Sequence, residues 1–241
     1  MKLYNIVKLS DAHVPFEDPV AVQAAIKFCK QLQPDIIVTD EWMDFYSLSR
    51  FLKRPDLMGG YTLNNARTTV QKYFVQIKKV CPNSRRVHLK SNHALRLPKY
   101  LMSKAPELYD LPELSIETFM GYNKLDIEHM DYFTVRDVFL FKHGDIIRKH
   151  SGYTARWEFD TEGMSGMSGH SHRRSQYDVT KRGGEYTWVE NGCLCRTDME
   201  YLEGKIPNWQ QGIGLVQFKG NTKQFAAHCL PIVNGEIIWG F

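Results

Sequence analysis

The amino-terminal part of the chain alternates short apolar runs with amphipathic stretches. Residues 3–9 and 35–38 are apolar runs of the length expected for buried strands. Between them, apolar residues recur every three or four positions up to about residue 33, which predicts a helix with one buried face. The pair Asp18-Pro19 has the residues typical of a helix start. A strand, a helix and a second strand are therefore predicted to open the chain.

The same alternation continues through the middle of the chain. An amphipathic helix is predicted over residues 63–80, and a strand is predicted over residues 86–90. Residues 94–130 contain several prolines and are expected to form a helical insertion of the kind that lines a substrate site. A strand is expected at residues 138–142, and the small Gly/Met/Ser stretch at residues 163–169 is expected to be a loop.

The carboxyl-terminal part of the chain is predicted to be mainly β-structure. From about residue 177 onward, short apolar runs are separated by turn residues. Asn234-Gly235 between two apolar runs is a strong indication of a hairpin. Together with the preceding helices, these strands predict two layers of sheet with helices outside, in a single domain that spans residues 1–241.

Length, charge and cysteine usage narrow the class of protein. The 241 residues, 43% of them hydrophobic, are enough to bury a full core. Subtracting 27 acidic from 31 basic residues gives a net charge of +4, which permits an anionic partner such as DNA or RNA without requiring one. No run approaches the roughly 18 apolar residues of a membrane span, so a soluble, cytoplasmic protein without a membrane partner is expected. The five cysteines, including the pair Cys193 and Cys195, are expected to be reduced structural thiols.

Five short polar islands follow apolar runs in a fixed order. They are Asp11-Ala12-His13, Thr39-Asp40, Ser91-Asn92-His93, His143-Gly144 and Gly169-His170-Ser171-His172. A rigid sheet can hold side chains from several strand ends in one place. Carboxylate, amide and imidazole donors together suit Mn, Fe or Zn better than Ca or Mg alone. The pattern therefore predicts a metal centre without a cysteine ligand.

In this order the islands resemble the signature of the calcineurin-like metallophosphoesterases, which reads D-x-H, GD, GNH, H and GHxH. The resemblance covers about residues 6–175, and residues 44–50 and 208–212 add similarity to small members of the family found in bacteriophages and prophages. It implies an α/β fold, a four-layer αββα sandwich of two mixed sheets flanked by helices. It also implies a hydrolase of phosphate esters that uses a hydroxide bridging two divalent metal ions as the nucleophile.

Carried over motif by motif, the resemblance gives each island a role. It assigns the first metal ion to Asp11, His13 and His172, the second to Asn92, His143 and His170, and the bridge between them to Asp40. Mn²⁺ is the expected ion, with Fe, Zn, Ni and Mg as alternatives. His93 is left to act as the general acid that protonates the leaving group. Arg50, Arg96 and Arg173 each follow a motif within a few residues and are expected to bind the substrate phosphate.

The identity of the bridging carboxylate is open in the sequence. Asp44 lies four residues after Asp40, whereas the family usually spaces the two by three. A register shifted by one residue would make Glu41 the bridge. Asp40 is preferred because it directly ends the predicted strand and because Asp is the usual bridging residue.

Three functions are compatible with the motifs. The mild basicity, the arginines beside the motifs and the phage-like resemblance favour a phosphodiesterase or nuclease over a phosphomonoesterase. A binding module with little turnover is the alternative from another class. Thr39 and Ser91 in place of glycine, and Ala94 in place of an acidic residue, support that module, whereas the presence of His93 opposes it. The oligomeric state is left open by the sequence.

Overall fold

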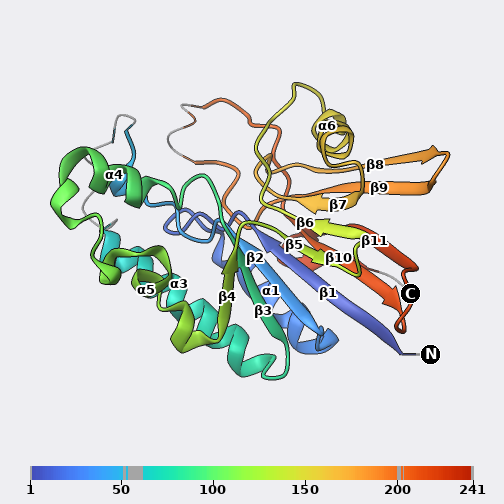
Figure 1. Cartoon of the computed structure of the whole chain (residues 1–241), viewed down its shortest axis with the longest axis horizontal. Helices are drawn as coiled ribbons and strands as arrows, with labels where there is room; N and C mark the ends of the chain where they lie inside the picture. Colours follow the sequence, from blue (N-terminus) through green and yellow to red (C-terminus); the bar gives the residue numbers. More distant parts are fainter. Residues whose placement is uncertain (1, 51–52, 54–61, 200–201, 203, 240–241) are drawn as a thin grey trace.

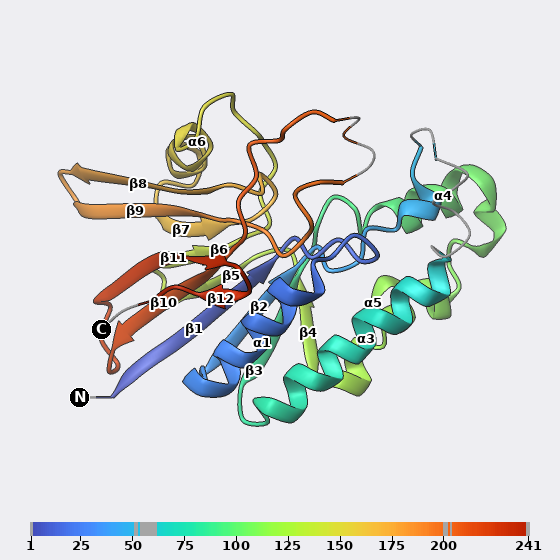
Figure 2. The ribbon, with the colours of Figure 1, turned by 180° about the vertical axis from the view of Figure 1, so that it is seen from behind.

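Two sheets packed face to face organise the molecule (Figure 1). The structure, a computed structural model, describes residues 2–50, 53, 62–199, 202 and 204–239. Helices α1 (Pro19–Leu32) and α3 (Leu63–Val80) cover the outer face of the larger sheet, and α6 (Tyr153–Glu162) covers the outer face of the smaller one (Figure 2). The fold is therefore a four-layer αββα sandwich, which confirms the fold implied by the sequence motifs.

The larger sheet has seven strands within the described residues. Its parallel strands, in spatial order, are β1 (Leu3–Ser10), β2 (Ile36–Asp40), β3 (Arg85–Leu89) and β4 (Ile127–Met130). Beyond β1 the sheet continues with the antiparallel strands β10 (Gly212–Lys219), β11 (Phe225–Val233) and β12 (Glu236–Ile237). Because β1, β2 and β3 are parallel, their carboxyl ends meet at one edge of the sheet.

The smaller sheet has five strands within the described part of the chain. They are, in spatial order, β5 (Phe133–Val135), β6 (Phe139–Phe141), β7 (Ser165–Ser168), β9 (Gly184–Asn191) and β8 (Arg174–Lys181). The prediction of a loop at residues 163–169 is wrong, because strand β7 lies within this stretch. A Cβ atom on Gly166 would lie 2.5 Å from the ring of Trp188. The small residues of β7 therefore make room for a large neighbour, and this hid the strand from the sequence pattern.

Short helices connect β3 to β4. They are α4 (Arg96–Lys104), η2 (Pro106–Leu108), η3 (Pro112–Leu114), α5 (Ile116–Met120) and η4 (Tyr122–Leu125). The helical insertion expected over residues 94–130 ends earlier than predicted, because residues 127–130 form β4 at the edge of the larger sheet. No helix among the described residues is both long and apolar enough to span a bilayer.

Alternation along β1 shows how the layers are built. Ile6 packs into the apolar layer between the two sheets, whereas Val7 and Leu9 pack into the layer beneath the helices. Lys8 lies on the same face of the strand as Ile6 and is fully buried. A buried ammonium group requires a partner of opposite charge, and that partner lies at the sheet edge described below.

Candidate metal centre

Two acidic residues occupy equivalent positions at the ends of neighbouring strands. Ser10 of β1 pairs with Asp40 of β2, so Asp11 and Glu41 are the next residues along each strand. Both have positive φ angles, 56° for Asp11 and 46° for Glu41, a left-handed conformation that is uncommon for residues other than glycine. The amide of Asp11 donates to the carbonyl oxygen of Asp40 at 3.2 Å, which ties the two strand ends together.

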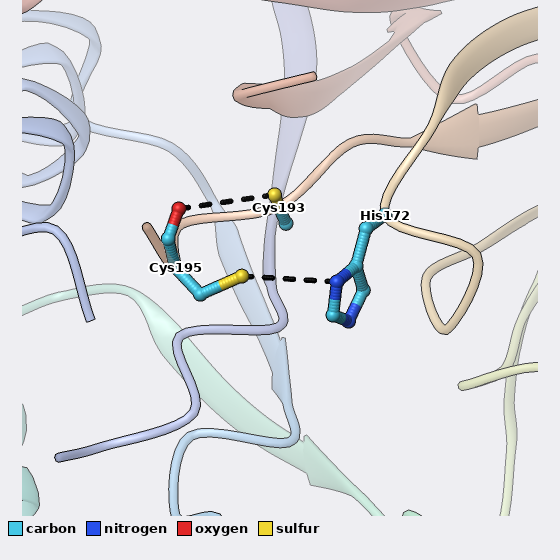
Figure 3. Close-up of side chains that lie close together, drawn as sticks. All are labelled: His172, Cys193 and Cys195. Carbon is cyan, nitrogen blue, oxygen red and sulfur yellow. Dashed lines mark hydrogen bonds between the residues drawn. The ribbon is translucent and has the colours of Figure 1, made fainter. Parts of the chain in front are cut away.

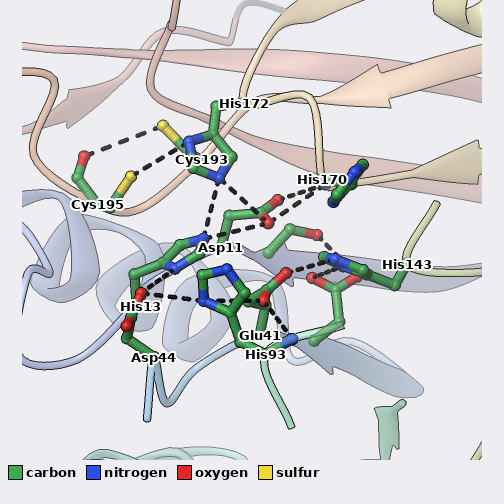
Figure 4. Close-up of polar contacts among 12 residues, drawn as sticks. Asp11, His13, Glu41, Asp44, His93, His143, His170, His172, Cys193 and Cys195 are labelled. Carbon is green, nitrogen blue, oxygen red and sulfur yellow. Dashed lines mark hydrogen bonds and ion pairs between the residues drawn. The ribbon is translucent and has the colours of Figure 1, made fainter. Parts of the chain in front are cut away.

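A first group of ligand atoms comes from Asp11, His13 and His172 (Figure 4). All three side chains are buried, and their ligand atoms lie within 4.8 Å of one another. His13 Nε2 and His172 Nε2 lie 3.0 Å apart, and Asp11 Oδ1 lies 3.7 Å from the first and 3.5 Å from the second. The three predicted ligands of the first metal ion are therefore brought together.

A second group comes from Glu41, His143 and His170, whose ligand atoms also lie within 4.8 Å of one another. Glu41 Oε2 contacts His143 Nε2, and Asn92 Oδ1 lies 2.8 Å from the same nitrogen. Three of the predicted ligands of the second metal ion, Asn92, His143 and His170, thus surround a carboxylate that was only an alternative in the sequence.

Glu41 lies between the two groups. Its other oxygen, Oε1, lies 3.3 Å from His93 Nδ1, and Glu41 forms a further ligand group with His13 and His93. The same carboxylate therefore faces His13 of the first group and His143 of the second. This is the position that a ligand shared by two cations requires.

Asp40 has a different environment. Its Oδ2 forms an ion pair of 2.5 Å with Lys8 Nζ, and both side chains are fully buried. Its Oδ1 lies 3.5 Å from His143 Nδ1, so Asp40 also forms a compact group with Asp11 and His143. A carboxylate behind the second nitrogen of a histidine ligand typically fixes the orientation of the ring. The bridging role stays a prediction, for which the geometry favours Glu41 over Asp40.

The charges in this cluster test whether the residues fit two cations. Burial lowers the pKa of His13, but its contacts with Asp11 and Asp44 outweigh burial and raise the pKa to about 10. The pKa of His143 is also raised well above its ordinary value, against burial, by Glu41 and Asp40. One histidine of each group therefore holds a proton that balances the carboxylates. A divalent cation would replace that proton and use the nitrogen as a ligand, so the donor set fits one cation in each group.

Asp44 holds three functional side chains in place. Its Oδ2 lies 3.0 Å from His13 Nδ1 and 3.0 Å from His93 Nδ1. Its Oδ1 accepts a hydrogen bond of 2.5 Å from Arg96 Nη1. Burial raises the pKa of Asp44, but its contacts with His13 and His93 reverse this effect and hold the pKa well below its ordinary value. No role was predicted for Asp44 from the sequence, although its place three residues after Glu41 was the available signal.

The three predicted phosphate-binding arginines have different environments. Arg96 lines a cleft beside the ligand groups, and its Nη2 lies 2.9 Å from His93 Nε2. Arg173 Nη1 donates instead to the carbonyl oxygen of Arg148 at 2.5 Å. Arg50 is exposed after the short helix η1 (Tyr46–Leu48). Their role toward substrate stays a prediction, and the geometry supports it best for Arg96.

Clefts open on both sides of the ligand groups. One, of about 610 Å³, lies over His13 and His93 and has an aromatic rim made by Tyr46 and Trp209. The other, of about 680 Å³, lies over His143 and includes the polar side chains of Lys90, Tyr132 and Thr134. Asn92 and His170 line both clefts. A molecule bound at the ligand groups can therefore extend in two directions.

Comparison with known sequences identifies relatives in bacteriophages. No protein-family model matches the chain. The Gene 54 protein of Mycobacterium phage D29 is 26% identical over 245 residues, and the match covers 96% of this chain and 95% of the phage protein. The Gene 54 protein of Mycobacterium phage L5 is 26% identical over 252 residues, with the same coverage of 96% and 95%. The similarity therefore extends over nearly the whole of each chain.

Solved structures with a similar fold include Vps29 proteins. Vacuolar Protein Sorting 29 of Cryptosporidium parvum has a TM-score of 0.50 and 11% identity, covering 98% of this chain and 95% of its own. A single mutant of Vps29 from Entamoeba histolytica has a TM-score of 0.50 and 10% identity, covering 97% and 96%. At these identities the likeness shows the fold alone. The chain thus has the calcineurin-like metallophosphoesterase fold, and its sequence relatives are encoded by bacteriophages.

Proposed function

We propose that this protein is a metal-dependent hydrolase of phosphate esters, and within that class a phosphodiesterase that acts on DNA or RNA. The observation that carries the proposal is the Glu41 carboxylate between two groups of buried ligands. Two-metal hydrolases hold their cations roughly 3.5–4 Å apart around such a shared ligand. The mixture of carboxylate, amide and imidazole donors supports Mn²⁺, with Fe, Zn, Ni or Mg as alternatives.

Each of the two ligand groups would bind one cation. Asp11, His13 and His172 would hold one cation, Asn92, His143 and His170 would hold the other, and Glu41 would contact both. When bound, two such cations stabilise the charge of the transition state and activate water as the nucleophile. Behind them, Asp44 orients the ring of His13 through the contact of 3.0 Å between Oδ2 and Nδ1. Asp40 Oδ1 faces Nδ1 of His143 at 3.5 Å.

His93 is the proposed general acid. Its ring lies in the cleft, and Nδ1 faces the carboxylates of Glu41 at 3.3 Å and Asp44 at 3.0 Å. In this structure Nε2 lies 2.9 Å from Arg96 Nη2, which can only donate. Proton donation from Nε2 to a leaving group therefore requires Arg96 to turn away from the ring. Bound phosphate would favour this movement, because a guanidinium group forms charge-assisted hydrogen bonds with phosphate and these would replace its contact with His93.

The clefts favour a diester over a monoester. A phosphodiester carries a substituent on each of two ester oxygens, and the two clefts extend from the ligand groups in two directions. The rim made by Tyr46 and Trp209 suits a nucleobase, because bases stack on aromatic side chains regardless of sequence. The net charge of +4 is favourable for a nucleic-acid partner. Relatives in mycobacteriophages support the cytoplasm of an infected host as the place of action.

The low-turnover binding module receives less support from the structure. Thr39 is an interior residue of the extended strand β2, where a side chain at this position causes no strain. Its hydroxyl lies 2.8 Å from His88 Nδ1 and is therefore used in packing. The residue that makes the left-handed turn is Glu41, two positions later. Thr39 therefore supports the binding module less than Ser91 and Ala94 do, and the effect of all three on turnover stays a prediction.

The test is manganese-dependent hydrolysis of bis-p-nitrophenyl phosphate beside p-nitrophenyl phosphate. Turnover that favours the diester, disappears after chelation and falls in His93→Ala would support the proposal. His228→Ala is the matched control, because His228 is exposed on β11, far along the chain from the motifs, and should leave turnover unchanged. Hydrolysis of the monoester alone would instead identify a phosphatase. No turnover of either ester by protein with two bound manganese ions would identify a binding module.

A further inference from the structure

Two buried cysteines lie directly behind the first ligand group. Cys193 and Cys195 follow strand β9, and neither is exposed to solvent. His172 turns Nδ1 toward them, 3.7 Å from Cys195 Sγ (Figure 3). Its other ring nitrogen, Nε2, lies 3.0 Å from His13 Nε2. One imidazole therefore has potential ligand partners at each of its two nitrogens.

We propose that Cys193, Cys195 and the Nδ1 atom of His172 form a further cation site for a thiophilic divalent ion such as Zn²⁺, and that this site shares only His172 with the first ligand group. The two sulfur atoms and the imidazole nitrogen lie within 4.8 Å of one another. Zinc binds sulfur at about 2.3 Å and imidazole nitrogen at about 2.0–2.1 Å, so a tetrahedral ion places these ligands roughly 3.6–3.8 Å apart. The observed separation of 3.7 Å between Cys195 Sγ and His172 Nδ1 matches this requirement.

The surroundings suit a complex without net charge. Phe16, Met199 and Trp209 pack around the two cysteines as an apolar cluster. A divalent cation with two thiolates and a neutral imidazole carries no net charge, which is the form that an apolar site tolerates. In the chelator-stripped protein, binding would release one proton from each thiol to solvent and form two metal–sulfur bonds and one metal–nitrogen bond, while His172 keeps the proton on Nε2. A cation in the first ligand group would use Nε2 as well, and the ring would then release that proton as a third. The carbonyl oxygen of Gln210, 3.7 Å from Cys193 Sγ, is available as a fourth donor.

The backbone that carries the cysteines is fixed to the candidate metal centre. The amide of Leu194, between them, donates to the carbonyl oxygens of Ser10 and Asp11 at 3.1 and 3.2 Å. The amide of Cys193 donates to the carbonyl oxygen of Gln210 at 3.1 Å. Ligands whose backbone is already held in place lose little conformational entropy on binding a cation. The three donors are thus arranged before any ion arrives.

Another pair of buried thiols provides a matched comparison. Cys29 and Cys81 both lie in the core beneath the helices, and burial, followed by the neighbouring Cys81, raises the pKa of the Cys29 thiol. Among the described residues, the compact groups of potential metal ligands include Cys193 and Cys195 but neither Cys29 nor Cys81. What distinguishes the proposed site is therefore the histidine, and not the burial of two thiols.

Cadmium titration of the reduced, chelator-stripped full-length protein tests the proposal. Cadmium bound by thiolates absorbs in the ultraviolet, and this absorption should saturate at one cadmium–thiolate centre per chain. It should be lost in the double variant Cys193→Ser/Cys195→Ser and kept in Cys29→Ser/Cys81→Ser. Asp11→Asn should also keep it, because Asp11 belongs to the first ligand group and not to the thiol site. A failure of the proposed phosphodiesterase function would therefore leave this signal in place.

Two results would overturn the proposal. One is a folded wild-type protein that binds cadmium without thiolate absorption, and the other is equal absorption in wild type and Cys193→Ser/Cys195→Ser. Should the serine variant fail to fold, cadmium NMR of the wild-type protein gives the answer by itself. A resonance in the range of sulfur-ligated cadmium supports the site, whereas resonances confined to the range of oxygen and nitrogen ligands contradict it.

Discussion

Neutralising Asp40 should damage folding more than it damages metal binding. Its partner Lys8 is fully buried, and the ion pair between Lys8 Nζ and Asp40 Oδ2 is 2.5 Å long. In Asp40→Asn the ammonium group keeps the hydroxyl of Ser10 at 2.6 Å but loses its counter-charge. Breaking a buried ion pair from one side typically costs about 3–5 kcal/mol. We therefore expect the free energy of unfolding of Asp40→Asn to fall by about that amount.

Neutralising Glu41 should damage metal binding more than it damages folding. Its carboxylate contacts the imidazole of His143 and raises its pKa against the effect of burial, so that ring can release its proton when the negative charge is removed. The loss of stability should therefore be smaller than in Asp40→Asn. For metal binding the order reverses, because Glu41 faces both ligand groups whereas Asp40 supports only the ring of His143. Loss of such a supporting group weakens metal binding by roughly 10–100-fold, and Glu41→Gln should exceed this range.

The two effects are measured separately. Urea unfolding of the chelated variants, followed by tryptophan fluorescence, gives the free energies of unfolding, and calorimetric titration with manganese gives the affinities. Lys8→Met/Asp40→Leu is the control for the ion pair, since replacing both partners by apolar residues is often neutral, and it should recover most of the stability. The reasoning would be refuted if Asp40→Asn folded normally but lost both manganese ions while Glu41→Gln kept them.

Three further predictions concern the acid, the pH dependence and the aromatic rim. His93→Ala should retain two manganese ions but lose turnover by roughly 10²–10⁴-fold, and full activity with a normal metal content would remove His93 from the mechanism. Against the effect of burial, Asp11 and Asp44 raise the pKa of His13 from 6.5 to about 10. The protonated ring of His13 therefore stabilises the metal-free fold fully below pH 6.5 and progressively less as the pH rises toward 10. The urea midpoint of the chelated protein should fall over this interval. A constant midpoint would contradict the raised pKa of His13. Tyr46→Ala should raise KM for a single-stranded oligonucleotide but not for bis-p-nitrophenyl phosphate, because a stacked base contributes about 1–3 kcal/mol, and equal effects on both substrates would exclude base stacking on this residue.

The sequence predicts elements well where their periodicity is strong. The helix expected over residues 63–80 begins and ends where α3 does, because its apolar positions repeat at helical spacing and polar residues fill the other face. β7 was missed because its small residues have no apolar pattern of their own. Their small size leaves space for the ring of Trp188, which packs against Gly166. β4 was missed inside a segment whose prolines and helical spacing dominated the pattern.

Contacts between distant residues account for what the sequence did not reveal about the site. The structure places the predicted histidines of the two metal groups, Asp11 and Asn92 close together, as the motifs predict, and their roles as ligands stay a prediction. The choice between Asp40 and Glu41, however, depends on which residue of β2 pairs with Ser10 and on the ion pair from Lys8. Neither fact is visible in a single sequence, because both depend on how two strands align. The contact of Cys195 with His172 likewise joins segments that no local pattern relates.

The most direct test of the account is anomalous diffraction at the manganese edge from crystals grown with Mn²⁺. We expect two manganese peaks roughly 3.5–4 Å apart, with the Glu41 carboxylate in contact with both and Asp40 still paired with Lys8. A single peak, or two peaks bridged by Asp40 with Lys8 displaced, would contradict it.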